Sequence, residues 1–177
     1  MHRKRLLALA PVVLALSATG MSTASAATSS APRAPEIKHV SSVVRLENRS
    51  EAEVTGTYRC WGPSDQMHLW VSVKQGGPDP TAMGSSTTVN AWYDTNISKD
   101  VRVRCDGEWH TKTVDVGRHP VANYPTDKEG TAPTRKLGYL HEGKAWVQFC
   151  LVPPGGEQLL ASSSRWVTVH DREDDDD

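Results

Sequence analysis

Three cysteines are the residues of this 177-residue chain whose chemistry is easiest to anticipate. In an oxidising compartment two should pair and one should remain a thiol. Cys60 lies in the alternating stretch 52–61, AEVTGTYRCW, and Cys105 ends VRVRC; each occupies the apolar phase of its stretch. This pattern favours a Cys60–Cys105 disulfide and leaves Cys150 as a free thiol, either buried and inert or a link between two copies. A Cys60–Cys150 pairing stays open as the alternative.

The remaining reactive side chains form no pattern that is typical of catalysis. No metal-binding spacing relates the six histidines beyond the N-terminal segment: His39, His68, His110, His119, His141 and His170. The chain has no G-x-S-x-G motif, no P-loop and no dinucleotide fingerprint. We therefore predict no catalytic residue, no metal site and no cofactor, and we expect that the protein is not an enzyme.

Tryptophan is the most suggestive residue type, with six tryptophans against one phenylalanine. Four of them, Trp70, Trp92, Trp146 and Trp166, fall on the strand phase opposite the aliphatic residues. If these rings are exposed, they offer an apolar platform of the kind on which sugar rings stack. The competing expectation is that they cover the second side of a sheet, since tryptophan is usually largely buried.

The elements that must position these residues are short strands. Alternating or apolar runs of strand length occupy residues 37–46, 52–61, 67–74, 87–93, 100–105, 109–116, 145–152 and 165–170. Glycine- and proline-rich turns separate them, and one helical turn is expected at 157–162. A long loop with three prolines spans 117–135. This pattern predicts an all-β protein of seven to eight short strands: a single antiparallel, immunoglobulin-like β-sandwich pinned by the disulfide, with a small β-barrel as the alternative.

The two ends of the chain have different compositions from the middle. Residues 1–26 combine a basic start, an apolar run and the small residues Ala24-Ser25-Ala26, which predicts a signal peptide that is cleaved near Ala26. We expect a disordered lead-in at 27–36, the β-sandwich domain at 37–170 and a disordered acidic tail at 171–177. The product is expected to be secreted.

Charge limits the partners. Without the three basic residues of the leader, 17 of the 20 basic residues remain against 21 acidic ones, a net charge of −4. The tail 171–177 contributes six acids and one base, so the rest of the mature chain is near +1. A nearly neutral body argues against nucleic acid as a partner. We expect no membrane attachment after processing.

Three segments carry a resemblance: TGTYRC at 55–60, VSVKQ at 71–75 and VRCDG at 103–107, behind an alanine-rich leader. In these the chain resembles small secreted actinobacterial, Streptomyces-like proteins that consist of a domain of unknown function. The resemblance implies an immunoglobulin-like sandwich in which the Gly-Thr-Tyr-Arg-Cys and Cys-Asp-Gly motifs are the two halves of one disulfide, with Cys150 additional to that pattern. It implies no activity.

Three hypotheses of function follow. The first is a secreted, non-catalytic binding module whose partner is an extracellular protein or another surface component. The second is binding of cell-wall polysaccharide through exposed tryptophans. The third is a secreted hydrolase, which would need a concave pocket that gathers histidine and carboxylate groups, or a hydrolase inhibitor, which would need a rigid exposed loop such as 117–135 or 76–84. A monomer is expected, with a Cys150-linked dimer as the alternative.

Overall fold

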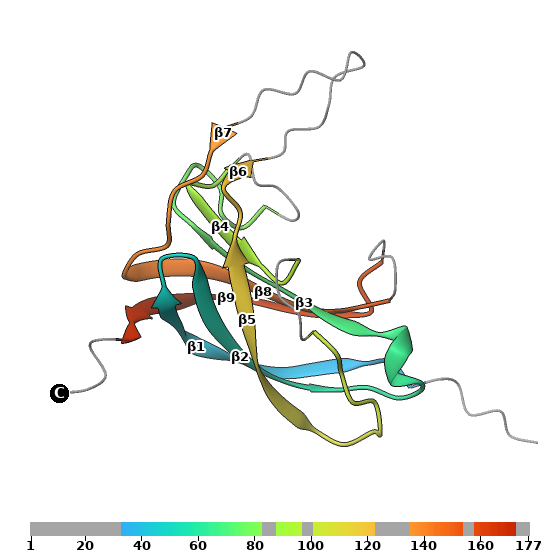
Figure 1. The fold of residues 1–177 in the computed structure, drawn as a ribbon. Coiled ribbons are helices and arrows are strands. Elements are labelled where there is room, and N and C mark those ends of the chain that lie inside the picture. Colours follow the sequence, from blue (N-terminus) through green and yellow to red (C-terminus); the bar gives the residue numbers. More distant parts are fainter. Residues whose placement is uncertain (1–32, 83–87, 97–100, 123–134, 154–157, 173–177) are drawn as a thin grey trace, which may run out of the picture. The chain divides into compact units, whose positions relative to one another are not determined.

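The structure, a computed structural model, is built from β-strands and one short 3-10 helix (Figure 1). It describes residues 33–82, 88–96, 101–122, 135–153 and 158–172. The predicted signal peptide and residues 173–177 of the predicted tail lie outside these ranges. The elements are β1 (Glu36–Asn48), β2 (Glu51–Arg59), η1 (Ser64–Gln66), β3 (His68–Gln75), β4 (Ala91–Asp94), β5 (His110–Arg118), β6 (Val121–Ala122), β7 (Arg135–Lys136), β8 (Gly143–Val152) and β9 (Ala161–Asp171).

Seven of the strands form one closed barrel in the order β1-β2-β5-β4-β3-β8-β9. The strand pairs are antiparallel except for β9 on β1, which is parallel and closes the sheet with Val44 beside Val169. The all-β prediction is confirmed, and the barrel that the sequence left as the alternative is the architecture observed. The expectation of two separate packed sheets is corrected, because this parallel pair joins the first and last strands of the order into one sheet.

The barrel interior is filled by the apolar phase of the alternating strands. In β2, Ala52, Val54 and Tyr58 are buried while the residues between them are partly exposed, as the period of two predicts. Phe149 of β8 is fully buried and its ring lies against Gly56 of β2: a Cβ atom on Gly56 would be 2.5 Å from a ring carbon. Glycine is therefore required at this position by the close approach of a core ring.

The first strand is irregular, which explains the loose alternation of its sequence. Its pairing with β2 shifts register three times, including once between Val40 and Val44. Both of these valines are nevertheless buried. Such bulges bend a strand and increase its twist, so they let β1 pair with β2 on one side and with β9 on the other.

The prediction of a strand at 100–105 is wrong. Among residues 101–105 the structure has only one isolated bridge, from Arg102 to His68. A disulfide joins Cys105 to Cys60, the pairing that the sequence favoured, and Cys150 is a buried thiol. Gly107 follows with a φ of 87°, which turns the chain into β5. β5 then pairs with β2 and β4.

Two further expectations differ at their boundaries. β4 runs from Ala91 to Asp94 and shares only 91–93 with the predicted strand at 87–93, and β9 starts at Ala161 rather than at 165. The predicted helical turn at 157–162 is not found in its described part, because Ala161 already pairs with Leu151 of β8. The loop predicted at 117–135 contains the start of a small β6–β7 ribbon, and its residues 123–134 lie outside the described part of the chain.

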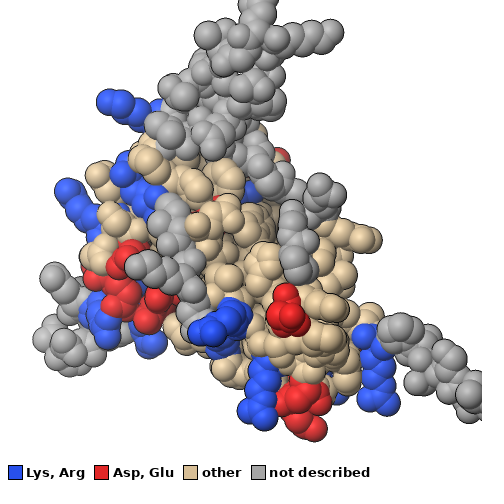
Figure 2. Space-filling model, turned by 45° about the vertical axis from the view of Figure 1, so that its right-hand side comes forward, with Lys and Arg blue, Asp and Glu red and all other residues tan. Residues whose placement is uncertain are grey.

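The surface carries both signs of charge. On the face drawn in Figure 2, acidic and basic side chains lie interspersed around a largely uncharged centre. This distribution agrees with a body whose net charge is close to zero. In the described residues, no helix is long and apolar enough to cross a membrane.

Candidate binding site on the outer face of the barrel

Strands β3 and β8 are buried on both faces, unlike their neighbours. Their burial patterns lose the alternation after the first few residues, so residues on the outward phase are as buried as those in the core. Ser72, Lys74, Gln148 and Cys150 all lie on this outward phase and are at most 1% exposed. Four polar or reactive side chains buried outside the main core make this face the strongest candidate for a functional site.

Strand register aligns three of the four singled-out tryptophans in one row across this face. Trp92 of β4 lies opposite Lys74 of β3, Lys74 lies opposite Trp146 of β8, and Trp146 lies opposite Trp166 of β9. His119, just after β5, donates its backbone N–H to the Trp92 carbonyl and extends the row by one position. We call His119, Trp92, Lys74, Trp146 and Trp166 the tryptophan row; at about 4.8 Å per strand it is roughly 19 Å long.

Neighbouring rings in the row contact each other. The rings of Trp92 and His119 stack with centroids 4.8 Å apart, and those of Trp146 and Trp166 meet edge to face at 5.2 Å. The ammonium group of Lys144 lies 4.1 Å from the centre of the Trp166 ring. Edge-to-face and cation–π contacts hold aromatic rings in fixed orientations. The row is therefore a pre-formed arrangement of rings.

Exposure along the row is lowest at Lys74 and highest at Trp166. Trp166 is 41% exposed and Trp146 is half-buried beside it, whereas Lys74 is fully buried. Trp92 packs with Val89 and Leu137 in a small second core on the outer face. The two expectations for these rings are thus each met in a different place: Trp92 covers the sheet, and Trp166 faces solvent.

Trp70 lies on the same outer face but apart from the row. Its partner across β8 is Cys150, two side-chain levels along the strand from the Lys74–Trp146 pair. Trp70 is half-buried. Register therefore puts all four predicted tryptophans on one face, but only Trp92, Trp146 and Trp166 belong to one row.

A polar cluster lies beside the row. The Lys74 ammonium donates hydrogen bonds to the Ala82 carbonyl (2.6 Å) and to Gln148 Oε1 (3.0 Å). On β4, Asp94 is fully buried; its Oδ1 is 2.8 Å from His119 Nε2 and accepts a 2.8 Å hydrogen bond from the Asn96 backbone N–H. Hydrogen bonds and the Asp94–His119 contact within this face therefore partly compensate its buried charges. Such compensation is required because burying an unpaired charge costs free energy.

Burial changes the acidity of two groups on this face. It lowers the pKa of Lys74 to about 8, against the smaller, raising influence of Asp79 and Asp94. Burial also raises the pKa of the Cys150 thiol to about 11. A protonated thiol in an apolar setting is a poor nucleophile, and its burial keeps it from a second chain, so both observations favour the inert role over the dimer link.

Two buried donors on this face have no acceptor. The indole N–H groups of Trp92 and Trp146 are inaccessible to solvent and have no hydrogen-bond partner within the described residues. They flank Lys74 in the row, one on each side. Buried donors without a hydrogen-bond partner are uncommon in folded proteins, so these two indole groups are an unusual feature of this face.

Raising the pH from 8 to 9 is expected to increase the free energy of unfolding, by up to about 1.4 kcal/mol per pH unit. Folded Lys74 loses its proton near pH 8 and unfolded Lys74 near 10.5, so in this window the unfolded state binds more protons and is disfavoured as pH rises. Above pH 9, Cys150 acts in the opposite direction, because its thiol ionises near 9.0 in the unfolded state and near 11 in the folded state. Urea titrations at several pH values measure both effects.

The matched variants for this pH dependence are Lys74→Met and Cys150→Ala. The first should abolish the rise between pH 8 and 9, and the second should keep it. An unchanged slope in Lys74→Met would show that the dependence has another source.

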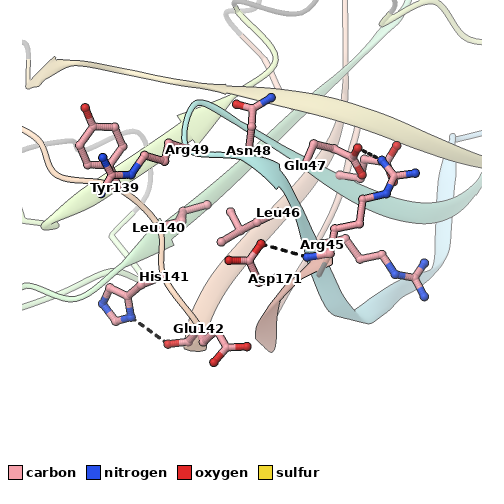
Figure 3. A pocket seen from close by; sticks show the side chains of 12 residues that line it. Arg45, Leu46, Glu47, Asn48, Arg49, Tyr139, Leu140, His141, Glu142 and Asp171 are labelled. Carbon is pink, nitrogen blue, oxygen red and sulfur yellow. Dashed lines mark hydrogen bonds and ion pairs between the residues drawn. The ribbon is translucent and has the colours of Figure 1, made fainter. Parts of the chain in front are cut away.

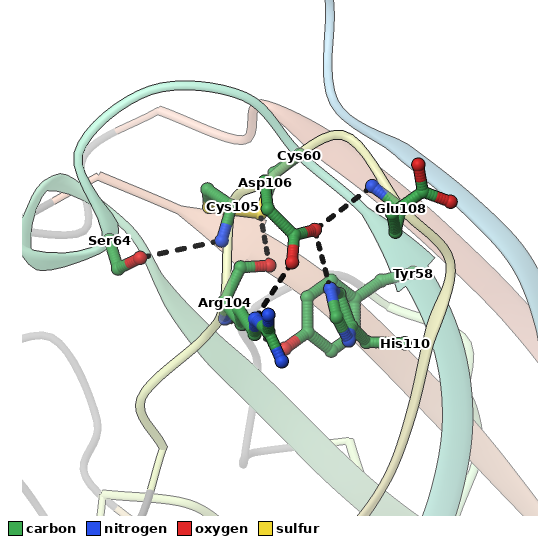
Figure 4. Close-up of polar contacts among 8 residues, drawn as sticks. All are labelled: Tyr58, Cys60, Ser64, Arg104, Cys105, Asp106, Glu108 and His110. Atoms are coloured by element: carbon green, nitrogen blue, oxygen red, sulfur yellow. Dashed lines mark hydrogen bonds and ion pairs between the residues drawn. A yellow bond between two sulfur atoms is a disulfide. The ribbon is translucent and has the colours of Figure 1, made fainter.

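The disulfide end of the barrel holds a second polar group (Figure 4). Asp106 Oδ1 is 2.7 Å from His110 Nε2 and accepts a hydrogen bond from the Glu108 backbone N–H, while Oδ2 pairs with Arg104 at 2.7 Å. These contacts, first of all the one with His110, lower the pKa of Asp106 to about 2. The Tyr58 hydroxyl accepts a hydrogen bond from the Arg104 backbone N–H. These contacts hold residues 101–109, the disulfide segment, against β2 and β5, which is a structural role.

Sequence reasoning did not single out the two tryptophans at this end. The Arg59 guanidinium lies between their rings, 4.9 Å from the centre of Trp61 and 4.5 Å from that of Trp109. Trp109 is 37% exposed, and Lys38 lies over its ring at 5.5 Å. The one sequence feature that could have placed a tryptophan at the disulfide is the position of Trp61 directly after Cys60. Two cations lie over each of these rings, Arg33 and Arg59 at Trp61 and Lys38 and Arg59 at Trp109, whereas one cation, Lys144, lies over Trp166. The two rings are therefore less suited to stacking on a ligand than Trp166.

An open hollow of about 1280 Å³ lies at the turn between β1 and β2 (Figure 3). Its lining mixes arginines with carboxylates, and Glu47 forms an ion pair with Arg172. His141 is present, but its Nδ1 is 2.8 Å from the backbone carbonyl of Glu142. In the described part of the chain no three histidine, cysteine or carboxylate groups are close enough to hold a metal ion. The hollow has no arrangement that points to a reaction.

Comparisons with known proteins assign no relative. No protein-family model and no curated protein matches the sequence. Among solved structures, a β-glucosidase from Kluyveromyces marxianus is similar over 77% of this chain and 15% of its own length, with 10% sequence identity and a TM-score of 0.28. A similarity at that TM-score supports no conclusion on fold or function.

Proposed function

We propose that this protein is an extracellular, non-catalytic binding protein and that it binds polysaccharide through the exposed end of the tryptophan row. The observation that carries the proposal is the Trp146–Trp166 pair: two rings in mutual contact at 5.2 Å, on one sheet face, with Trp166 41% exposed. A large exposed ring held in place by a second ring provides a stacking surface with little loss of side-chain entropy on binding.

The surroundings of the pair support a sugar as the ligand. Trp166 and Trp146 offer apolar ring area, and Lys144, Ser164 and Thr168 on the same face offer polar groups at its edge. A sugar ring needs this combination, because it has an apolar C–H face and a rim of hydroxyl groups. The disulfide between Cys60 and Cys105 is compatible with the extracellular location.

The other hypotheses have less support. A hydrolase would need reactive groups that converge in a cleft, and the buried polar groups on the outer face bond to one another instead. An inhibitor would present a rigid exposed loop, and the candidate loops at 117–135 and 76–84 lie partly outside the described residues. A protein partner at the same exposed pair is the second candidate, since exposed aromatics also anchor protein interfaces.

Replacing Trp166 by alanine is expected to weaken polysaccharide binding at least tenfold, because the loss of one stacking ring corresponds to about 1.4 kcal/mol or more. Protein produced from the full-length sequence is incubated with insoluble peptidoglycan, chitin and cellulose, and the bound fraction is measured. Intrinsic tryptophan fluorescence with soluble fragments of the same polymers gives the affinity.

The control is Trp109→Ala, which removes a ring of similar exposure from the disulfide end. It should leave binding unchanged. Retention on none of the three polymers would refute the polysaccharide proposal and leave a protein partner as the ligand of this surface. Equal loss in both variants would show that the binding surface is not the tryptophan row.

A further inference from the structure

Five side chains at the disulfide end of the barrel form an alternating stack of cations and rings. Each cation lies 4.5 to 5.7 Å from the centre of the ring that it faces. We call these residues the cation stack; in order they are Arg33, Trp61, Arg59, Trp109 and Lys38. Contact with a ring face holds a guanidinium or ammonium group in place without neutralising its charge. The stack therefore presents three cations in a fixed order.

The two outer cations of the stack are accessible. Arg33 and Lys38 are exposed, and neither has a carboxylate within ion-pair distance among the described residues. The middle cation differs, because the Arg59 guanidinium pairs with Glu36 Oε1 at 2.9 Å. An exposed cation without a carboxylate beside it keeps its full attraction for an anion from outside the chain. The capacity of the stack to bind anions is therefore concentrated at its two ends.

A further exposed cation lies beside the stack on the disulfide segment. Trp61 pairs with Asp106 through an isolated bridge, and Asp106 Oδ2 contacts the Arg104 guanidinium at 2.7 Å. The Arg104 side chain is nevertheless 76% exposed. Because His110 also contacts Asp106, this carboxylate is shared between two basic groups. The Arg104 guanidinium therefore stays accessible to a ligand.

The charge at this end of the barrel is positive, in contrast to the mature chain as a whole. The stretches 33–39, 59–66 and 101–112 carry six basic side chains against four acidic ones, a net charge of +2. A local excess of one sign attracts a polymer of the opposite sign even where the protein as a whole does not. The partner that complements this end is thus a polyanion.

The spacing of charges favours one class of polyanion. A nucleic acid duplex carries a charge about every 1.7 Å of its axis, so it would also press phosphates against the exposed carboxylates of Glu36 and Glu108. The charges of an acidic polysaccharide are separated by whole sugar units. They can meet Arg33, Lys38 and Arg104 individually, and they avoid the two carboxylates.

We infer that the cation stack and Arg104 form a second binding surface, and that its ligand is an anionic polysaccharide that bears carboxylate or sulfate groups. Guanidinium groups suit this ligand because their N–H forks match the oxygens of such anions. The three cations that would contact the ligand are already exposed, so binding requires no rearrangement of the chain. The surface shares no residue with the tryptophan row, and the inference does not depend on stacking at Trp166.

The test compares charged and uncharged polysaccharides on protein produced from the full-length sequence. The probes are dextran sulfate, polygalacturonate and uncharged dextran, with affinity measured by calorimetry at low and high salt. At least one anionic polymer should bind, dextran should not, and affinity should fall as salt rises. The two anionic probes distinguish sulfate from carboxylate as the recognised group. Arg33→Met combined with Lys38→Met should weaken binding about fivefold for each cation removed.

The matched control is Arg49→Met combined with Lys136→Met, which changes the net charge equally at exposed positions outside the cation stack. It should leave the affinity within about twofold. Glu36→Gln provides a variant of opposite sign: it removes the carboxylate that pairs with Arg59 and should raise the affinity several-fold. Because Glu36 is exposed, this variant is expected to fold normally.

Three results would overturn the inference. Absence of binding to both anionic polymers would show that this end recognises no polysaccharide charge. An equal loss in the Arg33–Lys38 variant and in the control pair would show that only the net charge of the protein matters. Tighter binding to duplex DNA or to vesicles of anionic lipid than to either anionic polymer would make nucleic acid or a membrane the partner instead.

Discussion

Replacing Cys60 and Cys105 together by alanine is expected to lower the free energy of unfolding by about 4 kcal/mol. The bond spans 45 residues, and loop-closure entropy for that separation corresponds to about 4 kcal/mol at 25 °C. The effect should be large because residues 101–109 form no strand: the disulfide, isolated bridges and the polar contacts of Arg104 and Asp106 hold them in place of a ladder. Denaturation in urea, with the far-UV circular dichroism signal as readout, measures the loss.

The control for the disulfide prediction is Cys150→Ala, which removes the buried thiol and leaves the disulfide. The unaltered protein in reductant should unfold at the same urea concentration as the double variant. If oxidised and reduced protein unfold together, the disulfide contributes nothing and the disulfide segment is held by its polar contacts alone.

Replacing Phe149 by alanine is expected to cost about 3–5 kcal/mol of stability, the range for truncating a buried phenylalanine. Phe149 is the single phenylalanine of the chain and is fully buried. It reaches across the barrel from β8 to Gly56 on β2, so its removal leaves a cavity between two strands that do not pair with each other. The barrel can collapse only partly into that space, because its strands are fixed by their ladders. The midpoint of urea unfolding measures the cost.

A coupled variant shows whether the ring and the glycine act as one unit. Gly56→Ala alone should destabilise the barrel by about 1–3 kcal/mol, since its Cβ would lie 2.5 Å from the Phe149 ring. In a Phe149→Leu background the same substitution should cost clearly less. Additive effects of the two substitutions would contradict the contact as the reason for glycine at this position.

Local pattern was enough to predict most of the strands and the phases of their residues. The alternation of β2 identified its buried face, and the opposite phase of Trp70, Trp92, Trp146 and Trp166 identified residues that share the outer face of the barrel. Both follow from the period of two in a strand, which is a property of a few consecutive residues. The disulfide partner followed from the same property, since Cys60 and Cys105 both lie on apolar phases.

The failed strand prediction at 100–105 has a related cause. Val101 and Val103 alternate with Arg102 and Arg104 as they would in a strand, but within the described residues the backbone of the stretch pairs only with the start of β3, through the bridge from Arg102 to His68 and the hydrogen bond from the Leu69 backbone N–H to the Val101 carbonyl. The stretch therefore finds no ladder and is held by the disulfide at Cys105. Strand formation needs a partner as well as a pattern, and a partner is not a local property.

What the sequence determined by itself is thus the secondary structure class, most strand positions, the inward and outward phases and the favoured cysteine pair, because each depends on residues a few positions apart. Tertiary structure alone decided the closure of the sheet through β1 and β9, the burial of both faces of β3 and β8, and the meeting of Lys74 with Trp92 and Trp146. These features depend on which strands lie side by side. That order is set by packing and ladder pairing between residues as many as 125 positions apart, such as Arg165 and the Val40 carbonyl.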